Sequence, residues 1–510
     1  MELSETIKSE YETLIYKYEN LVSSYESLKS EHEALKFEHE ALKGVIVALT
    51  GKVADLEAKR NKNSTNSNKP PSSDNVNKKP VKNNRFPSGR QTGGQPGHEG
   101  KTRPLSSSPD TVVKIKPREE CECGGQILIN DNNYIVKQVT DIERPKMITV
   151  EYQAFEGICK ACGKVHKASF PEGVKGVVSY GDNIQAIAAY LTTYQLIPLK
   201  RATELIEDLF GIKMSQATIL ASNQKAYENL AEPERQIKDE IINSDVAGFD
   251  ETGLRVMGEN FWLHVASTTL NTYYSVQRKR GQEAMDNIGI LPVFRGTAIH
   301  DHWKSYYKYL CAHGECNAHH IRQLLFIYEE LGCNWAMEMI CLLLKIKLHV
   351  DITKLFKAEG QEVNSLEQAD IEIYEKAYRK ILADAQLEIE KAKEKEKQEP
   401  EDESQEEPPI KVPKESQRMV KRLTEYEQEA LLFMYDFSVP FTNNLSERDL
   451  RMPKAHQKIS GGFRTENGAD VFARVRGFVS TVKKRGKNVF DGMAAIFKNN
   501  SKNFIFEESL

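Results

Sequence analysis

The chain has 510 residues, of which 39% are hydrophobic and 28% charged. It is long enough for about three domains, and its composition excludes collagen-like and wholly disordered proteins. Its eight cysteines are too few and too unevenly spaced for a disulfide framework. No apolar run reaches the roughly 18 residues of a membrane span, and the polar start lacks the apolar core of a signal peptide. We therefore expect a soluble cytoplasmic protein with reduced thiols.

The formal net charge of -4 combines segments of opposite sign. Residues 60–103 hold ten Lys or Arg against two acids, and residues 442–487 hold eleven against four. Residues 388–407 hold ten acids against four lysines. The two basic segments predict contacts with a polyanion, whereas the acidic run is typical of a solvated hinge.

Residues 1–59 carry a heptad pattern. Leu14, Leu21 and Leu28 belong to a series of leucines that recurs every seven residues, and a second set of residues follows four positions after each of them. This pattern predicts a left-handed coiled coil that joins copies of the chain, and a long helix packed on its own protein is the alternative. Residues 60–103 then form a flexible basic linker, which either follows DNA phosphates or serves as a spacer.

Residues 104–178 contain two cysteine pairs, each followed by a glycine. Cys121 and Cys123 form a C-x-C pair, and Cys159 and Cys162 form a C-x-x-C pair. Two such pairs are typical of the two halves of a four-thiolate zinc ribbon, with free thiols as the alternative. The sequence therefore predicts one structural Zn²⁺ ion held by the four cysteines.

The pattern becomes helical over residues 179–240. Gly211 is expected to end one helix and Ser215 to cap the next. This spacing indicates a helix-turn-helix, in which Ser215, Gln216 and Thr218 at the start of the second helix contact DNA. An ordinary three-helix packing unit is the alternative.

Two acids directly follow predicted strands. Residues 245–249, 261–268 and 272–277 read as three successive strands, residues 281–291 as a helix and residues 296–300 as a fourth strand. Asp250 and Asp301 come after the first and the fourth of these strands. Carboxylates on neighbouring strand ends can share a divalent cation, and hard oxygen ligands suit Mg²⁺ or Mn²⁺.

A third carboxylate is expected on a helix rich in basic residues. Glu447 stands near the start of that helix, and Arg451 shares its face, whereas Pro453 makes the same argument uncertain for residues further along. Any of these acids alone is more simply explained as a turn residue or a helix-terminal charge. Competing acids are Asp245, Glu251, Asp286 and Asp449, of which Asp449 points about 200° around the helix from Glu447.

The order of these features resembles the IS66 family of transposases. The resemblance rests on the heptad N-terminus, KPPSSD and GGQPGHEGKTR in the linker, the cysteine pairs, GFDETG, HDHWKSYYKY, CNAHHIR and NNLSERDLRMPKAHQKISGGFR. It implies a DDE catalytic domain with an RNase H-like α/β fold, in which Asp250, Asp301 and Glu447 are the three acids. Lys454 matches a basic residue that often lies seven positions after the glutamate. His319 and Arg322 match a C-x-A-H-x-x-R pattern whose role the sequence does not explain.

The resemblance implies a multidomain α+β protein. Its catalytic domain would comprise residues 241–310 and 440–495, with a helical insertion carrying an acidic loop at 311–439 and a C-terminal tail at 496–510. Expected DNA contacts, besides those of the helix-turn-helix, come from Arg451, Lys454, Lys458 and Arg464.

The expected function is that of a DNA transposase that cleaves the ends of its element and joins them to target DNA by two-metal phosphoryl transfer with Mg²⁺. Expected partners are DNA in the nucleoid, a second copy of the chain, and helper proteins encoded by the same element. The alternatives are a dimeric zinc-containing DNA-binding regulator without catalysis, and a metal-dependent DNA nuclease without strand transfer.

Overall fold

The computed structural model describes residues 103–507, with gaps at 131, 133, 143–144, 146, 172, 175, 357–362 and 399–413, and a few helical positions between residues 24 and 39. The rest of the predicted coiled coil, nearly all of the basic linker and much of the acidic loop lie outside the described residues. The chain divides into two compact units, one formed by residues 82–225 and the other by residues 1–81 and 226–510. In the described part of the chain, no helix combines the length and apolar character needed to cross a membrane.

The unit of residues 82–225 contains a small hairpin and a helical bundle. The antiparallel hairpin pairs β1 (Glu156–Ile158) with β2 (Val165–Lys167). The bundle consists of α2 (Asp182–Ala189), the π-helix η2 (Tyr190–Tyr194), α3 (Leu199–Phe210) and the start of α4 (Gln216–Asn229). Ile206 and Ile219 lie in the buried core of this bundle.

The second unit is built around a mixed five-stranded sheet with the order β5-β4-β3-β6-β7. Its strands β3, β4 and β5 are antiparallel neighbours, whereas β6 and β7 run parallel to β3. The predicted strands are all present, but Asp250, expected just after a strand, lies inside β3. The five strands are β3 (Val246–Val256), β4 (Glu259–Ser267), β5 (Thr272–Gln277), β6 (Thr297–His300) and β7 (Ala312–Glu315).

Strand β3 continues past Asp250 because β4 pairs with it along its whole outer half. The ladder runs from Gly248 opposite Ser267 to Val256 opposite Glu259. Met257 and Gly258 make the two-residue turn between the strands, and both have positive φ angles, of 54° and 81°. Two positive φ angles are required by the type I′ turn, whose twist matches that of paired strands.

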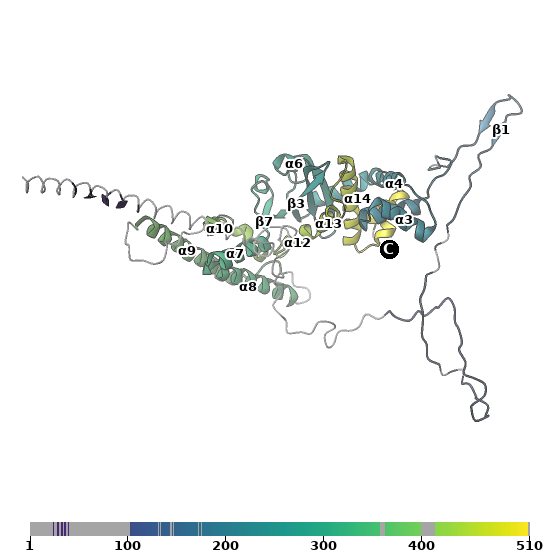
Figure 1. Cartoon of the computed structure of the whole chain (residues 1–510), viewed down its shortest axis with the longest axis horizontal. Helices are drawn as coiled ribbons and strands as arrows, with labels where there is room; N and C mark the ends of the chain where they lie inside the picture. The colour runs from purple at the N-terminus through teal and green to yellow at the C-terminus, as the bar shows by residue number, and fades with distance from the viewer. Residues whose placement is uncertain are drawn as a thin grey trace, which may run out of the picture. The chain divides into compact units, whose positions relative to one another are not determined.

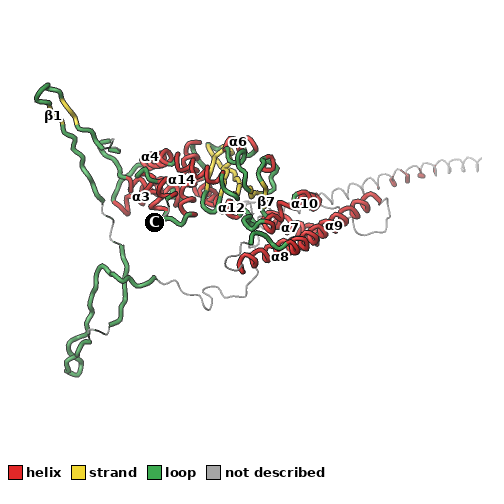
Figure 2. The backbone as a smooth tube through the Cα atoms, turned by 180° about the vertical axis from the view of Figure 1, so that it is seen from behind, coloured by secondary structure: helices red, strands yellow, loops and turns green. Residues whose placement is uncertain are grey.

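Helices cover the sheet, and further helices lie beyond its β7 edge. The predicted helix after β5 is present as α6 (Gln282–Ile288). Residues 312–315, expected at the start of the helical insertion, form the edge strand β7 instead, and the helices follow it. In Figures 1 and 2 these helices lie together beside β7. They are α7 (Asn317–Leu331), α8 (Asn334–Phe356), α9 (Gln368–Gln398), α10 (Lys414–Glu425) and α11 (Glu427–Tyr435).

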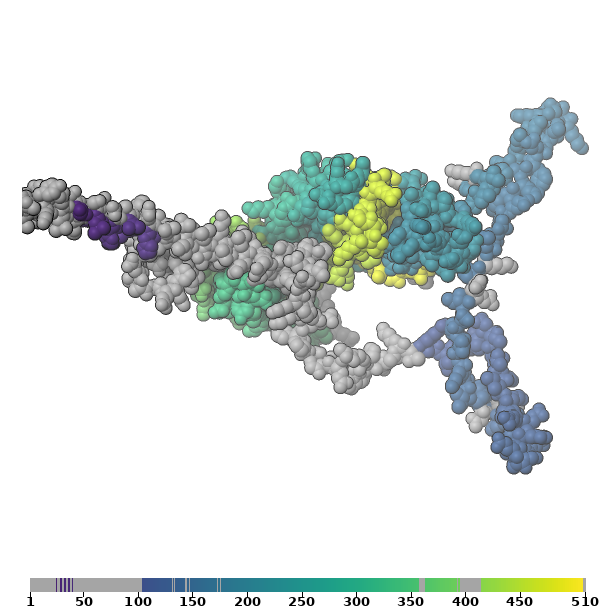
Figure 3. Space-filling model, viewed as in Figure 1, coloured from purple at the N-terminus to yellow at the C-terminus, as the bar shows by residue number. Residues whose placement is uncertain are grey.

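The C-terminal helices return to the antiparallel side of the sheet. Helix α14 packs on β5, and Gly477 permits this approach because an added Cβ would lie 3.1 Å from the carbonyl oxygen of Thr272. Figure 3 shows the C-terminal residues, in yellow, against the green-teal residues of the sheet unit. The remaining helices are α5 (Ala231–Ile242), α12 (Asn444–Asp449), α13 (Arg451–Ser460), α14 (Glu466–Lys484), α15 (Val489–Phe497) and α16 (Ser501–Phe506).

A half-buried histidine on α13 makes the stability of this unit depend on pH. The ring of His456 stacks on Phe463 with centroids 4.6 Å apart, and burial lowers the pKa of His456 to about 4. Because this pKa lies below that of the unfolded chain, near 6.5, the unfolded state takes up the proton first as the pH falls. Stability is therefore lost from about pH 6.5 down toward pH 4.

We expect His456→Phe to flatten this dependence, since the substitution keeps an aromatic ring and removes the titrating group. Between pH 7 and pH 5 the wild-type protein should lose about 2 kcal/mol more free energy of unfolding than the variant. Urea unfolding at both pH values measures the difference. Equal losses in the two proteins would contradict the prediction.

Candidate active site

The three predicted acids lie on three separate elements of the sheet unit, and among the described residues their ligand atoms do not form a group within 4.8 Å of one another. Asp250 lies on β3, Asp301 directly follows β6, and Glu447 lies on α12. Strands β3 and β6 are parallel neighbours, and their ladder pairs Gly248 with Ile299, so the same register two residues on puts Asp250 level with Asp301. Burial raises the pKa of Asp250 well above its usual range, and the charges of Glu251, Asp301 and Glu447 raise it further. Three other carboxylates therefore act on Asp250.

A close approach between α12 and β3 positions Glu447. An added Cβ at Gly248 would clash with the side chains of Asn443 and Ser446, so only glycine lets the start of the helix rest on the strand. The side-chain amide of Asn443 donates a 2.7 Å hydrogen bond to the carbonyl oxygen of Phe249. This bond ties the N-cap of α12 to the residue that precedes Asp250.

The electrostatics of the acids suit divalent cations. Burial and the charge of Glu251 raise the pKa of Asp301, whereas His319 and Arg280 oppose the shift. Clustered carboxylates that raise one another's pKa values gain stability when a cation neutralises them, and carboxylate oxygens are hard ligands of the kind that Mg²⁺ and Mn²⁺ prefer. The residues present therefore fit such ions.

Glu251 is a fourth carboxylate, which the sequence analysis ranked only among the competing acids. Its Oε1 accepts hydrogen bonds from the guanidinium of Arg280, with Nε at 2.7 Å, and its Oε2 accepts one from the hydroxyl of Tyr306. The guanidinium of Arg280 also lies 4.2 Å from the ring centroid of Trp303 and 5.1 Å from that of Trp262. Because Glu251 is held in this way, we interpret it as a support of the site.

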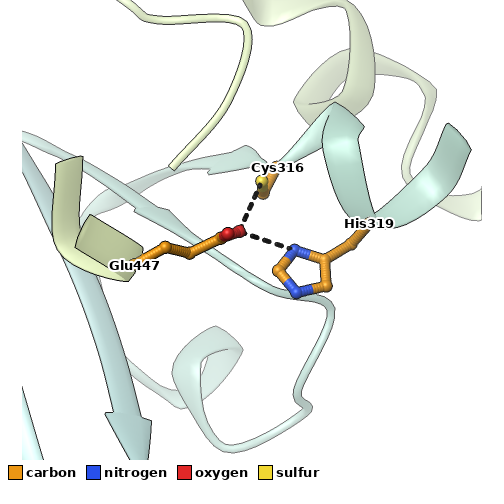
Figure 4. Close-up of side chains that lie close together, drawn as sticks. All are labelled: Cys316, His319 and Glu447. Atoms are coloured by element: carbon orange, nitrogen blue, oxygen red, sulfur yellow. Dashed lines mark hydrogen bonds and ion pairs between the residues drawn. The ribbon is translucent and has the colours of Figure 1, made fainter. Parts of the chain in front are cut away.

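Cys316, His319 and Arg322 of the C-x-A-H-x-x-R pattern all contact Glu447, which gives the pattern a structural role. The Sγ of Cys316 lies 3.8 Å from Oε1 of Glu447, and Nδ1 of His319 lies 3.7 Å from the same oxygen. Arg322 donates from Nη2 to the other oxygen, Oε2, at 3.3 Å. Figure 4 shows the carboxylate of Glu447 reaching from α12 to the thiol and the imidazole at the start of α7.

The helix that carries Glu447 is interrupted at Leu450. Helix α12 ends at Asp449 and α13 begins at Arg451. Pro453 cannot donate to the carbonyl oxygen of Asp449, and the hydroxyl of Tyr274 donates to that oxygen instead, at 2.8 Å. The break lies slightly before the position expected from Pro453, so an unbroken helical face does not continue from Glu447 to the basic residues.

The predicted basic DNA contacts differ in their exposure. Arg451, Lys458 and Arg464 are exposed to solvent. Lys454 is half-buried, and its ammonium donates a 3.0 Å hydrogen bond to the carbonyl oxygen of Gly253 on β3. Burial also lowers the pKa of Lys454. Lys454 thus braces α13 on the sheet, while the three exposed cations are available to a polyanion.

The predicted helix-turn-helix residues lie at the start of α4. Gly211 ends α3 in a left-handed conformation with a φ angle of 69°, and Ser215 Oγ accepts a 3.1 Å hydrogen bond from the backbone N–H of Thr218. Both features agree with the predicted helix end and cap. Ser215 and Gln216 are exposed, and Thr218 is half-buried. DNA contact by these residues stays a prediction.

Each predicted zinc-binding pair occupies its own tight turn. Backbone bonds close the turn at Cys121 and the turn at Cys159, and hydrogen bonds within each pair lower the pKa of Cys121 and of Cys159. Among the described residues, one group of potential ligand atoms lies within 4.8 Å of one another, and it contains none of the four cysteines of the two pairs. The two turns suit a thiolate metal site, but they are not assembled into one.

Removing metal should unfold the module of residues 104–178 and leave the sheet unit folded. None of its described residues is buried, so the module has no packed core, and a Zn²⁺ ion held by four thiolates would supply the missing stability. The measurement is the zinc content of the purified chain, followed by proteolysis before and after chelation. A metal-free preparation whose module resists protease as well as the zinc-loaded one would disprove the prediction.

The fold is that of a mixed α+β protein in which a five-stranded sheet and a flanking helix carry the candidate carboxylates. Residues 177–471, more than half of the chain, match the Transposase IS66 family. The chain therefore belongs to the IS66 family of transposases. Residues 16–104 match a family of unknown function, DUF6444. No curated protein matches the chain.

Proposed function

We propose that this protein is a DDE transposase whose Asp250, Asp301 and Glu447 hold the two Mg²⁺ ions of a phosphoryl-transfer site. The observation that supports the proposal is that Asp250 and Asp301 lie at the same level of two adjacent parallel strands, while the N-cap of α12, the helix of Glu447, is hydrogen-bonded to β3. The mixed five-stranded sheet, with Asp250 and Asp301 on adjacent parallel strands, supports an RNase H-like catalytic domain. Bound Mg²⁺ would activate water or a DNA 3′-hydroxyl and stabilise the leaving oxygen.

The protein's own residues fix the ligands before DNA arrives. Asn443 anchors the start of α12 to β3, and Arg322 holds one oxygen of Glu447. Arg280 holds Glu251 next to Asp250. Preorganised ligands need little rearrangement during the reaction, which is the general source of electrostatic catalysis.

The remaining assignments belong to the same proposal. The coiled coil of residues 1–59 would join two protomers, and the zinc module together with residues 179–240 would recognise the ends of the element. Exposed Arg451, Lys458 and Arg464 would contact phosphates. Proteins encoded by the same element would assist.

The test is incubation of the full chain with the end sequences of its element and Mg²⁺. We expect nicks at the 3′ ends, followed by products in which those ends are joined to target DNA. Nicks without joined products would favour a nuclease, and binding without nicks would favour a regulator. Neither alternative is favoured by membership of a transposase family.

A further inference from the structure

Cys316, His319 and Glu447 offer three different ligand atoms to one point in space. The Sγ of Cys316, a ring nitrogen of His319 and a carboxylate oxygen of Glu447 all lie within 4.8 Å of one another, and they form a metal-ligand group within the described residues. Figure 4 shows the thiol of Cys316 and the imidazole of His319 both next to the carboxylate of Glu447. The first two come from the N-cap and first turn of α7, and the third comes from α12.

The spacing of these atoms is close to that of a tetrahedral metal site. Zinc binds sulfur at about 2.3 Å and nitrogen or oxygen at about 2.0 Å, so tetrahedral angles would separate neighbouring ligand atoms by about 3.3–3.5 Å. Oε1 of Glu447 lies 3.8 Å from the sulfur of Cys316 and 3.7 Å from Nδ1 of His319. These two distances exceed the tetrahedral separations by a few tenths of an ångström, and the ligand atoms of Cys316 and His319 lie within 4.8 Å of each other.

The surroundings leave these ligand atoms ready for a cation. Nδ1 of His319 is buried and makes no hydrogen bond. Arg322 takes the other oxygen of Glu447, so Oε1 stays directed at the thiol and the imidazole. The backbone N–H of Asn443 donates to the sulfur of Cys316 at 3.1 Å, whereas burial and the charge of Glu447 raise the pKa of Cys316 to about 12, so a bound cation would have to displace the proton of the thiol.

We propose that Cys316, His319 and Glu447 form a site for one transition-metal cation of the zinc class, which differs in its ligands from the hard-oxygen site for Mg²⁺ but shares Glu447 with it. Thiolate, imidazole and carboxylate together suit Zn²⁺ and Co²⁺, whereas Mg²⁺ binds oxygen. Three protein ligands leave a fourth position for water. Glu447 belongs to both sites, so zinc would compete with Mg²⁺ for it. This competition rests on the proposed function, but the binding site does not.

The test is a Co²⁺ titration of the full chain that carries Cys121→Ser, Cys123→Ser, Cys159→Ser and Cys162→Ser. These four cysteines would also bind cobalt, and no described residue of their module is buried, so the background should leave the sheet unit folded. We expect one equivalent of Co²⁺ with sulfur-to-metal charge-transfer absorbance. Absence of that absorbance would overturn the proposal.

Variants in that background identify the ligands. Cys316→Ser should abolish the charge-transfer absorbance, and His319→Gln or Glu447→Gln, which keep the thiol, should weaken Co²⁺ affinity at least tenfold. Cys341→Ser is the matched control, because Cys341 is an exposed thiol on α8, and it should change nothing. Absorbance that survives in Cys316→Ser, or unchanged affinity in both other variants, would refute the site.

Activity separates this proposal from the proposed function. In the same background Asp250→Asn should keep the cobalt absorbance, because Asp250 is not among the three ligands. In the wild-type chain, with the four cysteines of the zinc module intact, added Zn²⁺ should inhibit end cleavage. Excess Mg²⁺ should relieve this inhibition. Cobalt binding in a chain that never cleaves DNA would leave the metal site standing and reject the transposase mechanism.

Discussion

Asp250→Asn, Asp301→Asn and Glu447→Gln should each lower the rate of end cleavage by several orders of magnitude while folding and DNA binding persist. Each substitution keeps the size of the side chain and removes a charge that would hold Mg²⁺. Loss of one ligand misplaces an ion that stabilises both the attacking and the leaving oxygen, an effect on the order of 4 kcal/mol or more. Cleavage of labelled end DNA measures the rate.

Although Asp250→Asn should lower the rate of cleavage, it should not lower the thermal stability of the protein. Burial and three neighbouring acids raise its pKa, so the ionised carboxylate is unfavourable in the metal-free protein. Asp250→Asn should therefore keep or raise the melting temperature without metal. A structural acid would instead lose stability when replaced by an amide.

Asp245→Asn is the control for the acids. Asp245 directly precedes β3, and it is exposed, so its replacement should leave both cleavage and stability unchanged. Near wild-type cleavage by any of the three variants would show that the acids are assigned wrongly. The same conclusion would follow if Asp245→Asn were as inactive as Asp250→Asn.

Much of the sheet could be predicted because its strands have a strong local pattern. Alternating or continuous apolar residues marked β3 to β6, and the turn residues between them were visible. The apolar run of this strand stops before Asp250, which predicts a strand end there, yet pairing with β4 keeps the segment extended. Strand β7 was missed because Ala312–Glu315 is short and has no apolar periodicity, and only its pairing with β6 makes it a strand.

The support of the site could not be predicted, since it depends on contacts between distant residues. Cys316 and Arg322 meet Glu447 across 131 and 125 positions of the chain. Arg280 lies in the loop after β5 and binds Glu251, and no sequence spacing indicates that these two residues meet. A motif reveals which residues matter, whereas their partners emerge only once the sheet and α7 are folded together.

Asp449 illustrates the same limit. Its helical spacing, about 200° around the helix from Glu447, predicts that Asp449→Asn changes cleavage little. Its side chain is 11% exposed and pairs with Lys484 at 2.8 Å, and Lys484 is equally buried. Ser267, Thr272 and Ser480 also donate hydrogen bonds to the carboxylate. These bonds join α12 to β4, β5 and α14, so replacement of Asp449 should lower stability even though the residue lies off the proposed metal face.

Asp449→Asn should lower the free energy of unfolding by about 3 kcal/mol, because it leaves the ammonium of Lys484 buried without its counter-ion. Urea denaturation at neutral pH measures the loss. The double variant Asp449→Asn with Lys484→Met should recover part of it, since the uncompensated charge is then removed. The folded fraction should still cleave element ends, which separates this acid from Glu447 on the same helix. A single variant as stable as the wild type would show that this buried ion pair does not hold α12 on the sheet.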